Sequence, residues 1–370
     1  MAGRCLVAGG GMAGLVAAAR ATELGCEALL YEKAAFGGSM VLSSGVVWRH
    51  SEWESFRAEC AAGDAALQRL VWERLDESIE WLRRLGAPVL EPVTGNPLTT
   101  GVRFDPPALR DALLGRLEPR ATIAAPAPLE QGAAATATIL ATGGFAASRE
   151  LVARYIAPAA PLRRRGNAAS SGDGLRHGLA RGAALSVGMD EFYGRNMPDA
   201  PWSEPDYVPL AQLYARHARI FDATGCEFFA AADVSWSETN VVEATARRPG
   251  ACAYYLLDAA ALSQLVRGRS VAEIVAAAPA PARVDLAQLP FRPPRGTAIA
   301  VRVTAAITHT IGGLRVDGHA RVLDERDEPI PGLYAAGVDA GGVAAGGYAS
   351  GLAQALVLGL AAAESVAAGL

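Results

Sequence analysis

The first fourteen residues place the strongest constraint on what this chain can fold into. Residues 4–8 are an apolar run of strand length, and they lead into Gly9-Gly10-Gly11-Met12-Ala13-Gly14 and an alanine-rich helical stretch. Gly9 allows the tight turn from strand to helix, Gly11 lets the backbone approach a pyrophosphate, and Gly14 lets the helix pack closely on the strand. The segment therefore predicts a Rossmann-like dinucleotide site, with the diphosphate on the N-terminus of the helix.

An acidic residue closes the second predicted strand. The apolar run 28–31 ends in Glu32, roughly 20 residues after the glycine turn, where a carboxylate accepts ribose hydroxyls. The same charge would repel a 2′-phosphate, which argues against NADP. A lone glycine motif can arise by chance in a glycine-rich chain, but here strand, helix, second strand and acid occur in the required order.

A second glycine-rich segment lies near the C-terminus. Residues 330–337 are an apolar run that ends in Gly337, residues 341–351 are dense in glycine, and an apolar helix is expected to follow. Further blocks lie between the two ends, at residues 37–39, 43–45, 140–145, 171–174 and 309–313.

In this order, the blocks resemble the fumarate reductase/succinate dehydrogenase flavoprotein family, which also includes ketosteroid dehydrogenases. The resemblance runs from residue 4 to about residue 360 and so covers nearly the whole chain. It implies FAD rather than NAD, because NAD enzymes do not need the C-terminal block. The FAD contacts expected from the glycine turn and the resemblance are Gly9, Gly11, Met12, Ala13, Gly14, Glu32, Lys33, Gly38, Ser39, Ser43, Ser44, Gly45, Thr142, Gly143, Gly144, Asp173, Gly337, Asp339, Gly351 and Leu352.

The resemblance also bears on how FAD is held. Membrane-bound relatives tether the flavin to a histidine in the loop after the acidic strand, whereas residues 37–41 here contain none, so we expect noncovalent FAD. Asp339 stands one residue later than the family's acidic position, which is Val338 in this chain. We expect Asp339 either to bind a ribityl or phosphate-adjacent group or to lie on the surface. The helix after Gly351 would direct its N-terminus at the flavin.

The expected fold class is α/β, with a discontinuous Rossmann-like FAD-binding domain and an inserted, reduced α+β substrate-capping domain. The FAD-binding domain comprises residues 1–200 and 298–370, and the capping domain comprises residues 201–297. A stripe of apolar residues predicts a helix from Asp64 to Leu85, and Asp105 followed by two prolines predicts the start of another. Between residues 120 and 138 the β-meander of the resembling family is expected to be largely deleted, with a return strand at residues 137–141.

Two side chains are candidates for polarising a substrate carbonyl. The resemblance implies hydride transfer between flavin N5 and a carbon β to a carbonyl, with proton transfer at the α carbon and donors that hold the carbonyl. His309 occupies the position of a family histidine that grips the carbonyl or carboxylate; a structural histidine bonded to backbone is the alternative. Tyr348 stands where ketosteroid dehydrogenases have a tyrosine and fumarate reductases an arginine; the alternative is a buried aromatic.

The capping domain departs from the fumarate reductase pattern. Arg195 matches a position that often carries a substrate-binding histidine and could bind a carboxylate, although a solvated loop arginine is the alternative. Residues 226–236 lack the family's arginines and Asn-Glu pair, and Trp236 or its neighbours fall where a proton-transferring arginine is expected. An aromatic residue there suits a bulkier, less charged substrate than fumarate. The missing base could be any of Tyr207, Tyr214, His217 and Glu238.

Composition limits the partners. The chain has 370 residues, 51% of them hydrophobic, a net charge of −4 and no long basic run, so nucleic acid is not expected as a partner. Five scattered cysteines lack metal-ligand spacing, which predicts buried free thiols, no metal and a cytoplasmic location. We expect no signal peptide and no membrane span. No Cys-x-x-Cys-His haem site is present, so any electron donor or acceptor must be separate.

Three functions remain open from the sequence. The leading one is an FAD-dependent dehydrogenase or reductase that acts on a carbon–carbon bond next to a carbonyl, giving α,β-desaturation or its reverse on a small carbonyl or carboxylate substrate. The second is a flavin-dependent oxidase, aromatising enzyme or isomerase on a biosynthetic intermediate. The third is a non-catalytic protein that retains the FAD fold for binding, and the intact glycines of both segments argue against it.

Overall fold

The computed structural model describes residues 4–117, 121–124, 129 and 137–369. It divides into two compact units. Unit 1 comprises the residues up to Leu151, Asn167–Glu191 and the residues from His309 onward; unit 2 comprises Val152–Gly166 and Phe192–Thr308. The segment expected to form the capping domain, residues 201–297, lies within unit 2, and its substrate-capping role stays a prediction.

Unit 1 is built on a mainly parallel six-stranded sheet. Strands β1 (Arg4–Ala8), β2 (Glu27–Tyr31) and β7 (Ala137–Leu140) form its centre, and the full order is β17-β18-β7-β1-β2-β6. In β1, Val7 pairs with Leu30 of β2 and with Ile139 of β7, and the side chains of residues 5–8 are buried. A continuous apolar run is what a parallel strand covered on both faces requires. The outer strands are β6 (Ala121–Ala124), β17 (Arg321–Leu323) and β18 (Pro329–Ala335).

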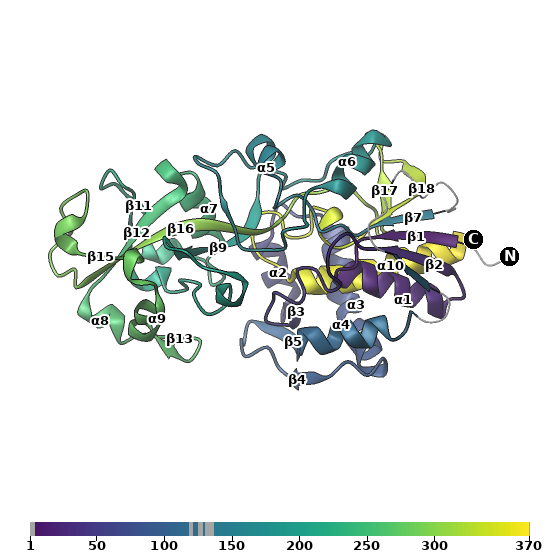
Figure 1. The fold of residues 1–370 in the computed structure, drawn as a ribbon, viewed down its shortest axis with the longest axis horizontal. Coiled ribbons are helices and arrows are strands. Elements are labelled where there is room, and N and C mark those ends of the chain that lie inside the picture. The colour runs from purple at the N-terminus through teal and green to yellow at the C-terminus, as the bar shows by residue number, and fades with distance from the viewer. Residues whose placement is uncertain (1–3, 118–120, 125–128, 130–136, 370) are drawn as a thin grey trace. The chain divides into compact units, whose positions relative to one another are not determined.

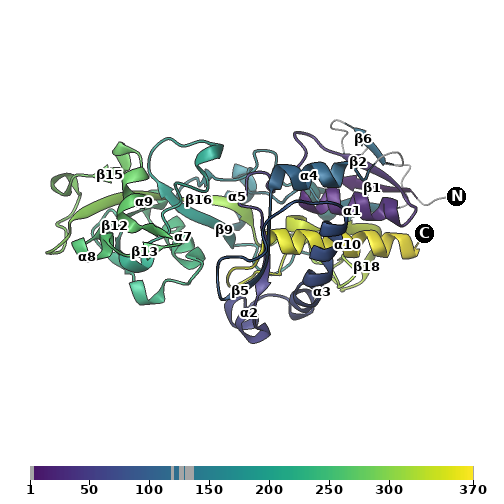
Figure 2. The ribbon, with the colours of Figure 1, turned by 90° about the horizontal axis from the view of Figure 1, so that it is seen from below.

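Two helices of small residues pack side by side in unit 1. Helix α1 (Met12–Glu23) lies along α10 (Gly351–Gly369), as Figures 1 and 2 show. A Cβ atom at Gly359 would lie 2.8 Å from the carbonyl oxygen of Ala13, so a larger residue there would separate the helices. By length and composition α10 could cross a membrane (mean hydropathy 1.5), but 61% of it is buried inside the protein. Among the described residues no other helix meets that test, and the burial of α10 is that of a core helix.

The helix predicted from the apolar stripe and the helix predicted to start at Asp105 are confirmed. Helix α3 (Ala65–Arg84) begins after Asp64, whose carboxylate accepts from the N–H groups of Ala66 and Leu67 at 2.9 Å. Helix α4 (Pro106–Leu114) begins after Asp105, which accepts from the N–H of Ala108. Unit 1 also contains α2 (Trp53–Glu59), α6 (Asp173–Ala180) and an antiparallel sheet of β3 (Val46–His50), β5 (Thr99–Phe104) and β4 (Val89–Glu91). Helix α5 (Arg149–Tyr155) runs across the boundary from unit 1 into unit 2.

Unit 2 is an α+β unit around a second sheet. Strand β16 (Ile299–Thr310) pairs with β12 (Cys252–Leu257), and β10 (Arg219–Phe221) continues the sheet to β11 (Glu227–Phe229). The remaining strands and helices are β8 (Arg163–Arg164), β9 (Phe192–Pro198), α7 (Thr239–Ala246), α8 (Ala259–Leu262), β13 (Leu265–Val266), β14 (Arg269–Ser270), α9 (Val271–Ala277) and β15 (Arg283–Val284).

Strands β10 and β11 form an antiparallel hairpin whose turn lies at residues 222–226. The return strand predicted at residues 137–141 is confirmed as β7. The predicted loss of a meander between residues 120 and 138 lies largely outside the described residues.

Candidate functional site

The glycine turn after β1 has the geometry that its sequence predicts. Gly9 has a φ of +104°, and a Cβ atom there would lie 2.3 Å from the carbonyl oxygen of Ala141. A Cβ atom at Gly14 would lie 1.7 Å from the carbonyl oxygen of Gly9, so the helix can sit this close only without a side chain. Gly11 differs, because a Cβ atom there would meet nothing within 4 Å. Gly9 and Gly14 are thus needed by the fold, whereas Gly11 leaves open space in front of the turn.

The start of α1 is suited to an anion. Gly11 is its N-cap, and among the described residues no side chain caps the helix. The first N–H groups, including those of Met12 and Ala13, therefore have no partner within the helix or from a cap. Such a terminus, with the helix dipole behind it, favours a phosphate group.

Glu32 is held in place at the end of β2. Its Oε2 accepts from the backbone N–H of Gly10 and its Oε1 from that of Ala34, both at 2.6 Å. Each carboxylate oxygen retains a further lone pair, so Glu32 can still accept ribose hydroxyls as the sequence predicts.

The loop after Glu32 lies against the glycine turn. Gly37 and Gly11 form an isolated parallel β-bridge, and a Cβ atom at Gly38 would lie 3.2 Å from the Cα of Gly11. Farther along, the Ser43 hydroxyl donates to the carbonyl of Met40 at 2.7 Å and accepts from the N–H of Gly45 at 3.1 Å. In the same loop Ser39 is half-buried and Ser44 is exposed. The structure thus brings the predicted flavin loop to the predicted diphosphate turn.

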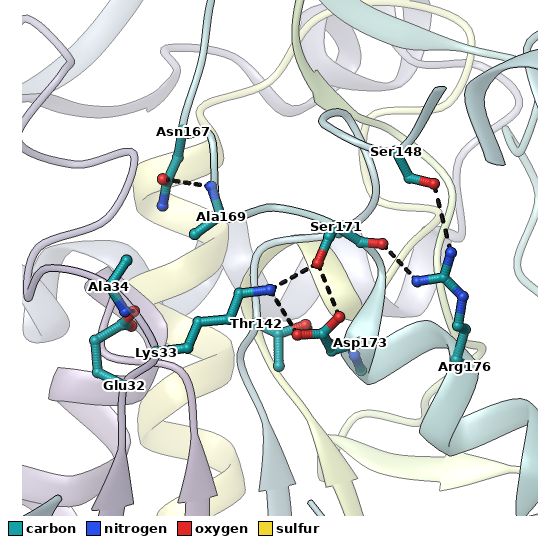
Figure 3. A network of polar contacts seen from close by, with 12 residues as sticks. Glu32, Lys33, Ala34, Thr142, Ser148, Asn167, Ala169, Ser171, Asp173 and Arg176 are labelled. Atoms are coloured by element: carbon teal, nitrogen blue, oxygen red, sulfur yellow. Dashed lines mark hydrogen bonds and ion pairs between the residues drawn. The ribbon is translucent and has the colours of Figure 1, made fainter. Parts of the chain in front are cut away.

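Lys33 and Asp173, which the sequence places 140 residues apart, form an ion pair. The Lys33 Nζ lies 2.6 Å from Asp173 Oδ2 and 2.6 Å from the Ser171 hydroxyl, which itself donates to Asp173 Oδ1 at 2.8 Å (Figure 3). Burial would raise the pKa of the Asp173 carboxyl, but the hydrogen bonds from Lys33 and Ser171 outweigh it and the pKa is lowered. The Asp173 carboxyl is therefore ionised near neutral pH and accepts from Lys33.

Asp339 faces the interior. Its side chain is 1% exposed; Oδ1 accepts from the Thr142 hydroxyl at 3.1 Å and from the N–H of Gly144 at 3.0 Å, and Oδ2 accepts from the N–H of Thr142. The expected surface alternative for Asp339 is therefore wrong. The carboxylate holds the turn Thr142–Gly144 after β7, in which Gly143 (φ +89°) and Gly144 (φ +72°) adopt a conformation that favours glycine.

The C-terminal block places His309 on the N-terminus of α10. A Cβ atom at Gly351 would lie 3.2 Å from His309 Nε2, so glycine lets the imidazole lie close against the start of the helix, and a side chain there would press on the ring. Upstream, Gly337 (φ +64°) and Ala340 direct their carbonyls at the Gln354 amide, which donates to them at 2.9 and 2.6 Å. Leu352 follows Gly351 in the first turn of α10.

The hydrogen bond of His309 selects its tautomer. Nδ1 lies 3.2 Å from the carbonyl oxygen of Thr310, which can only accept, so Nδ1 carries the proton and a neutral ring leaves Nε2 as an acceptor. Burial lowers the pKa of His309, although the Thr310 carbonyl opposes this. A neutral His309 is thus better suited to accept a proton than to grip a carbonyl.

Tyr348 lies in an aromatic cluster that sequence reasoning missed. Its ring centroid is 5.3 Å from that of Trp48, and its backbone carbonyl accepts from His50 Nε2 at 3.1 Å. His50 stacks on Phe56 with ring centroids 5.2 Å apart. The signal in the sequence was the strand-like run Val46–His50 directly after the flavin loop, which brings Trp48 and His50 back to the C-terminal block.

In unit 2, Arg195 is buried rather than solvated. Its side chain is 4% exposed, its guanidinium donates to the carbonyl of Ser237, and its Cζ lies 4.8 Å from the centroid of the Tyr193 ring. The expected solvated-loop alternative is therefore wrong. Glu238, which follows Ser237, is also buried; burial raises the pKa of Glu238 to about 7, against the opposing charge of Arg195.

Glu238 stands out among the four bases that the sequence left open. Tyr214 is fully buried and donates to the Gln212 side chain at 2.8 Å, and burial raises its pKa well above the usual value. Burial and the nearby charge of Arg216 lower the pKa of His217. Tyr207 uses its carbonyl to hold Arg165. Glu238 is the carboxyl of this group that can exchange a proton near neutral pH.

The cysteines differ from the expectation in one respect. All five are free, and Cys5, Cys26 and Cys60 are buried as expected, but Cys226 is exposed and Cys252 is half-buried. Cys226 lies in the turn between β10 and β11. Among the described residues, no group of three His, Cys, Asp or Glu side chains could hold a metal ion.

Comparison with known families identifies the cofactor of unit 1. The chain matches the FAD binding domain family over residues 4–128 and 100–352, so it belongs to that family. The predicted FAD is thereby confirmed. The residues present fit the group, because the open face of Gly11, the uncapped start of α1 and the fixed Glu32 carboxylate offer what a diphosphate and a ribose need.

Solved structures of the same fold confirm the predicted resemblance. A flavocytochrome c3 fumarate reductase in its open conformation shares 21% identity and a TM-score of 0.69, over 99% of this chain and 78% of that one. The 3-ketosteroid-Δ4-(5α)-dehydrogenase of Rhodococcus jostii RHA1, in complex with 4-androstene-3,17-dione, shares 18% identity and a TM-score of 0.71, over 99% and 97%. The 3-ketosteroid Δ1-dehydrogenase of Sterolibacterium denitrificans, in complex with 1,4-androstadiene-3,17-dione, shares 17% and 0.70, over 99% of each chain. The predicted α/β fold class is therefore confirmed.

Proposed function

We propose that the protein is an FAD-dependent oxidoreductase that desaturates, or reduces, a carbon–carbon bond next to a carbonyl in a small cyclic or bulky substrate. The observation that carries this proposal is the position of the His309 imidazole against Gly351, at the N-terminus of α10. Gly351 lies three residues after Tyr348 in the sequence. When bound, FAD supplies the hydride transfer, so the chain itself needs only to hold the carbonyl and move one proton. Two of the solved neighbours are ketosteroid dehydrogenases in complex with steroid diones, which supports a carbonyl substrate.

His309 is assigned as the proton acceptor at the carbon α to the carbonyl. Its Nδ1–H is committed to the Thr310 carbonyl, so the neutral ring carries its basic lone pair on Nε2, the nitrogen that would accept a substrate proton. The lowered pKa keeps the ring neutral at physiological pH. This assignment differs from the expectation that His309 grips the carbonyl, since an acceptor nitrogen cannot donate to a carbonyl oxygen.

Tyr348 is assigned as the donor to the substrate carbonyl. A phenol hydroxyl can donate to an oxygen on which negative charge builds when the α proton leaves. The bond from His50 to its carbonyl and the Trp48 ring fix the backbone and ring of Tyr348. Aromatic neighbours suit an apolar ketone better than a dicarboxylate, which would need cationic partners. The predicted role of Arg195 in substrate binding and the predicted substrate-capping role of residues 201–297 remain part of the proposal.

The first test compares two classes of substrate, a cyclic ketone and a dicarboxylate, as reductants of the flavin. FAD-loaded protein is mixed without oxygen with a saturated cyclic ketone, such as a 3-ketosteroid, or with succinate, and the flavin absorbance is followed. We expect bleaching with the ketone and not with succinate; bleaching with succinate alone would overturn the proposal. Release of peroxide on admission of air would instead favour the oxidase alternative.

A second assay tests the two assigned residues. A ketone deuterated at the α carbon should lose its label to solvent in the presence of the oxidised protein, and His309→Asn should slow this loss by about 10²- to 10⁴-fold. Tyr348→Phe should slow it as well, by about 10²-fold. His319→Asn, at an exposed histidine of unit 1, is the matched control and should exchange at the wild-type rate. We also propose noncovalent FAD, a cytoplasmic location and a separate electron partner.

A further inference from the structure

Lys33 is the one lysine in the sequence. The chain has 34 basic residues of these two types, so 34 − 1 = 33 of them are arginine. All the other basic positions of these two types are arginine. The lysine at position 33 is therefore an exception in this chain. A site that keeps lysine in such a chain requires a property that arginine does not have.

The geometry around Lys33 shows what that property is. Its Nζ atom lies 2.6 Å from Ser171 Oγ and 2.6 Å from Asp173 Oδ2, and the two acceptor side chains are joined by a third bond of 2.8 Å (Figure 3). One compact ammonium with three rotatable donors can reach both partners at once. A planar guanidinium is longer and spreads its donors over a rigid fork, so it would bond the two partners through different nitrogens and shift the loop that carries it.

The contacts of Lys33 are the first link in a chain of hydrogen bonds. Asp173 begins α6, and the next N–H, that of Gly174, donates to the Thr142 hydroxyl at 2.9 Å. That hydroxyl donates in turn to Asp339 Oδ1 at 3.1 Å. The series therefore connects four segments that the sequence holds far apart: the loop after β2, the start of α6, the turn after β7 and the segment before α10. All four carry residues that were predicted to contact FAD.

The Lys33–Asp173 pair contributes little to global stability. The two side chains are 36% and 38% exposed, and ion pairs at such positions are worth about 0–1 kcal/mol. The effect of the pair is therefore expected on the position of the loop after β2 and not on the free energy of unfolding. Glu32 precedes Lys33 directly and is itself tied to Gly10, so a fixed Lys33 keeps the ribose-binding carboxylate in register with the turn after β7.

We propose that Lys33 is a positioning residue that latches the loop after β2 to the N-terminus of α6, and that this latch, which arginine cannot form, sets the affinity for FAD. The sequence predicts that Lys33 and Asp173 contact FAD directly. In this proposal they act instead by holding Glu32 and Thr142 in position. The inference rests on FAD binding by unit 1 and is independent of the reaction proposed above.

The first test measures FAD affinity, with no substrate present. Apo-protein of the wild type, K33R, K33M, D173N and the double variant K33M/D173N is titrated with FAD. We expect K33R to weaken binding about as much as K33M, by roughly tenfold or more, while the unfolding midpoint of each apo-protein stays close to that of the wild type. The double variant should bind FAD no more weakly than either single variant, because each single substitution already removes the whole Lys33–Asp173 interaction.

The matched control is R321K, which exchanges the same two cations in an exposed ion pair of unit 1 with Asp317. Its FAD affinity should equal that of the wild type. Wild-type affinity in K33R would overturn the requirement for an ammonium. If the losses of FAD affinity in K33M and D173N add up in the double variant, the two residues contact FAD independently, and the proposed latch is overturned.

A second measurement reads the latch directly. Protein labelled with ¹³C-lysine gives one lysine spin system, since the sequence holds one lysine. In the wild type the ε-CH₂ signal should differ from that of free lysine with and without FAD, and in D173N it should move to the free-lysine position. An unchanged signal in D173N would overturn the inference. None of these outcomes depends on whether the proposed ketone oxidation occurs.

Discussion

Asp339 holds Thr142 by two hydrogen bonds across 197 residues of sequence, one from the Thr142 hydroxyl at 3.1 Å and one from its backbone N–H. A third bond, from the N–H of Gly144, completes the set of donors to this carboxylate. The segment before α10 therefore shapes the turn after β7, and with it the end of the strand that borders the glycine turn.

Removal of the Asp339 carboxylate should destabilise the apo-protein. D339A leaves buried donors of Thr142 and Gly144 without partners, and D339N brings amide hydrogens against them, so each should lower the free energy of unfolding by about 2–3 kcal/mol. Urea unfolding of the apo-protein checks this, with D327N at an exposed loop as the control. An apo-protein of wild-type stability that has lost FAD affinity would instead make Asp339 a direct FAD ligand.

Alanine substitutions at Gly11 and Gly14 should have different effects, G11A on FAD affinity and G14A on the stability of the fold. G11A adds a methyl group into open space at an ordinary φ of −76°, so the apo-protein should keep or slightly gain stability, by less than about 1 kcal/mol. Its FAD affinity should fall because the methyl group occupies the approach of the diphosphate. G14A drives a methyl group into the Gly9 carbonyl and should cost more than about 3 kcal/mol. Thermal unfolding and FAD titration of both variants check the pair; wild-type FAD affinity in G11A would place the diphosphate elsewhere.

The pH dependence of turnover should report His309. A proton acceptor must be neutral, and burial lowers the pKa of His309 below its usual value of 6.5, so activity should fall only as the pH drops below 6.5. The acid limb of kcat/KM against pH should disappear in H309N together with most of the rate. A limb that persists unchanged in H309N would assign the titration to another group.

Replacement of Glu238 should change how stability depends on pH. Burial raises the pKa of Glu238 to about 7 from 4.5, so the folded protein binds more protons than the unfolded chain and loses stability as the pH rises through that window. E238Q stays neutral and should be more stable than the wild type above pH 7, by up to about 3 kcal/mol, but not below pH 4.5. The groups that act on this carboxyl are Arg195, Arg216, Arg267, Tyr214, Tyr255 and the N–H of Ala215. Urea unfolding of E238Q and the wild type above pH 7 and below pH 4.5 checks this. An equal difference in the free energy of unfolding at both pH values would show that Glu238 does not titrate between them.

The sequence by itself determined the family, the cofactor and most of the elements, because those signals are local. Gly14 is needed by its contact with the Gly9 carbonyl five residues earlier, and Gly9 by its φ of +104° in the turn itself. Asp64 and Asp105 cap helices through N–H groups two or three residues away. Such requirements act over a few residues and can therefore be predicted from their spacing alone.

Only the tertiary structure decided how the separate blocks meet. From the sequence, the shift of the acid from position 338 to Asp339 indicated either a ligand or a surface residue. Packing excluded the surface residue, because it turned the carboxylate inward onto Thr142. The bond from His50 to the Tyr348 carbonyl and that from Lys33 to Asp173 span 298 and 140 residues. Side-chain direction at such distances is fixed by the packing of whole elements, and no local pattern in the sequence encodes it.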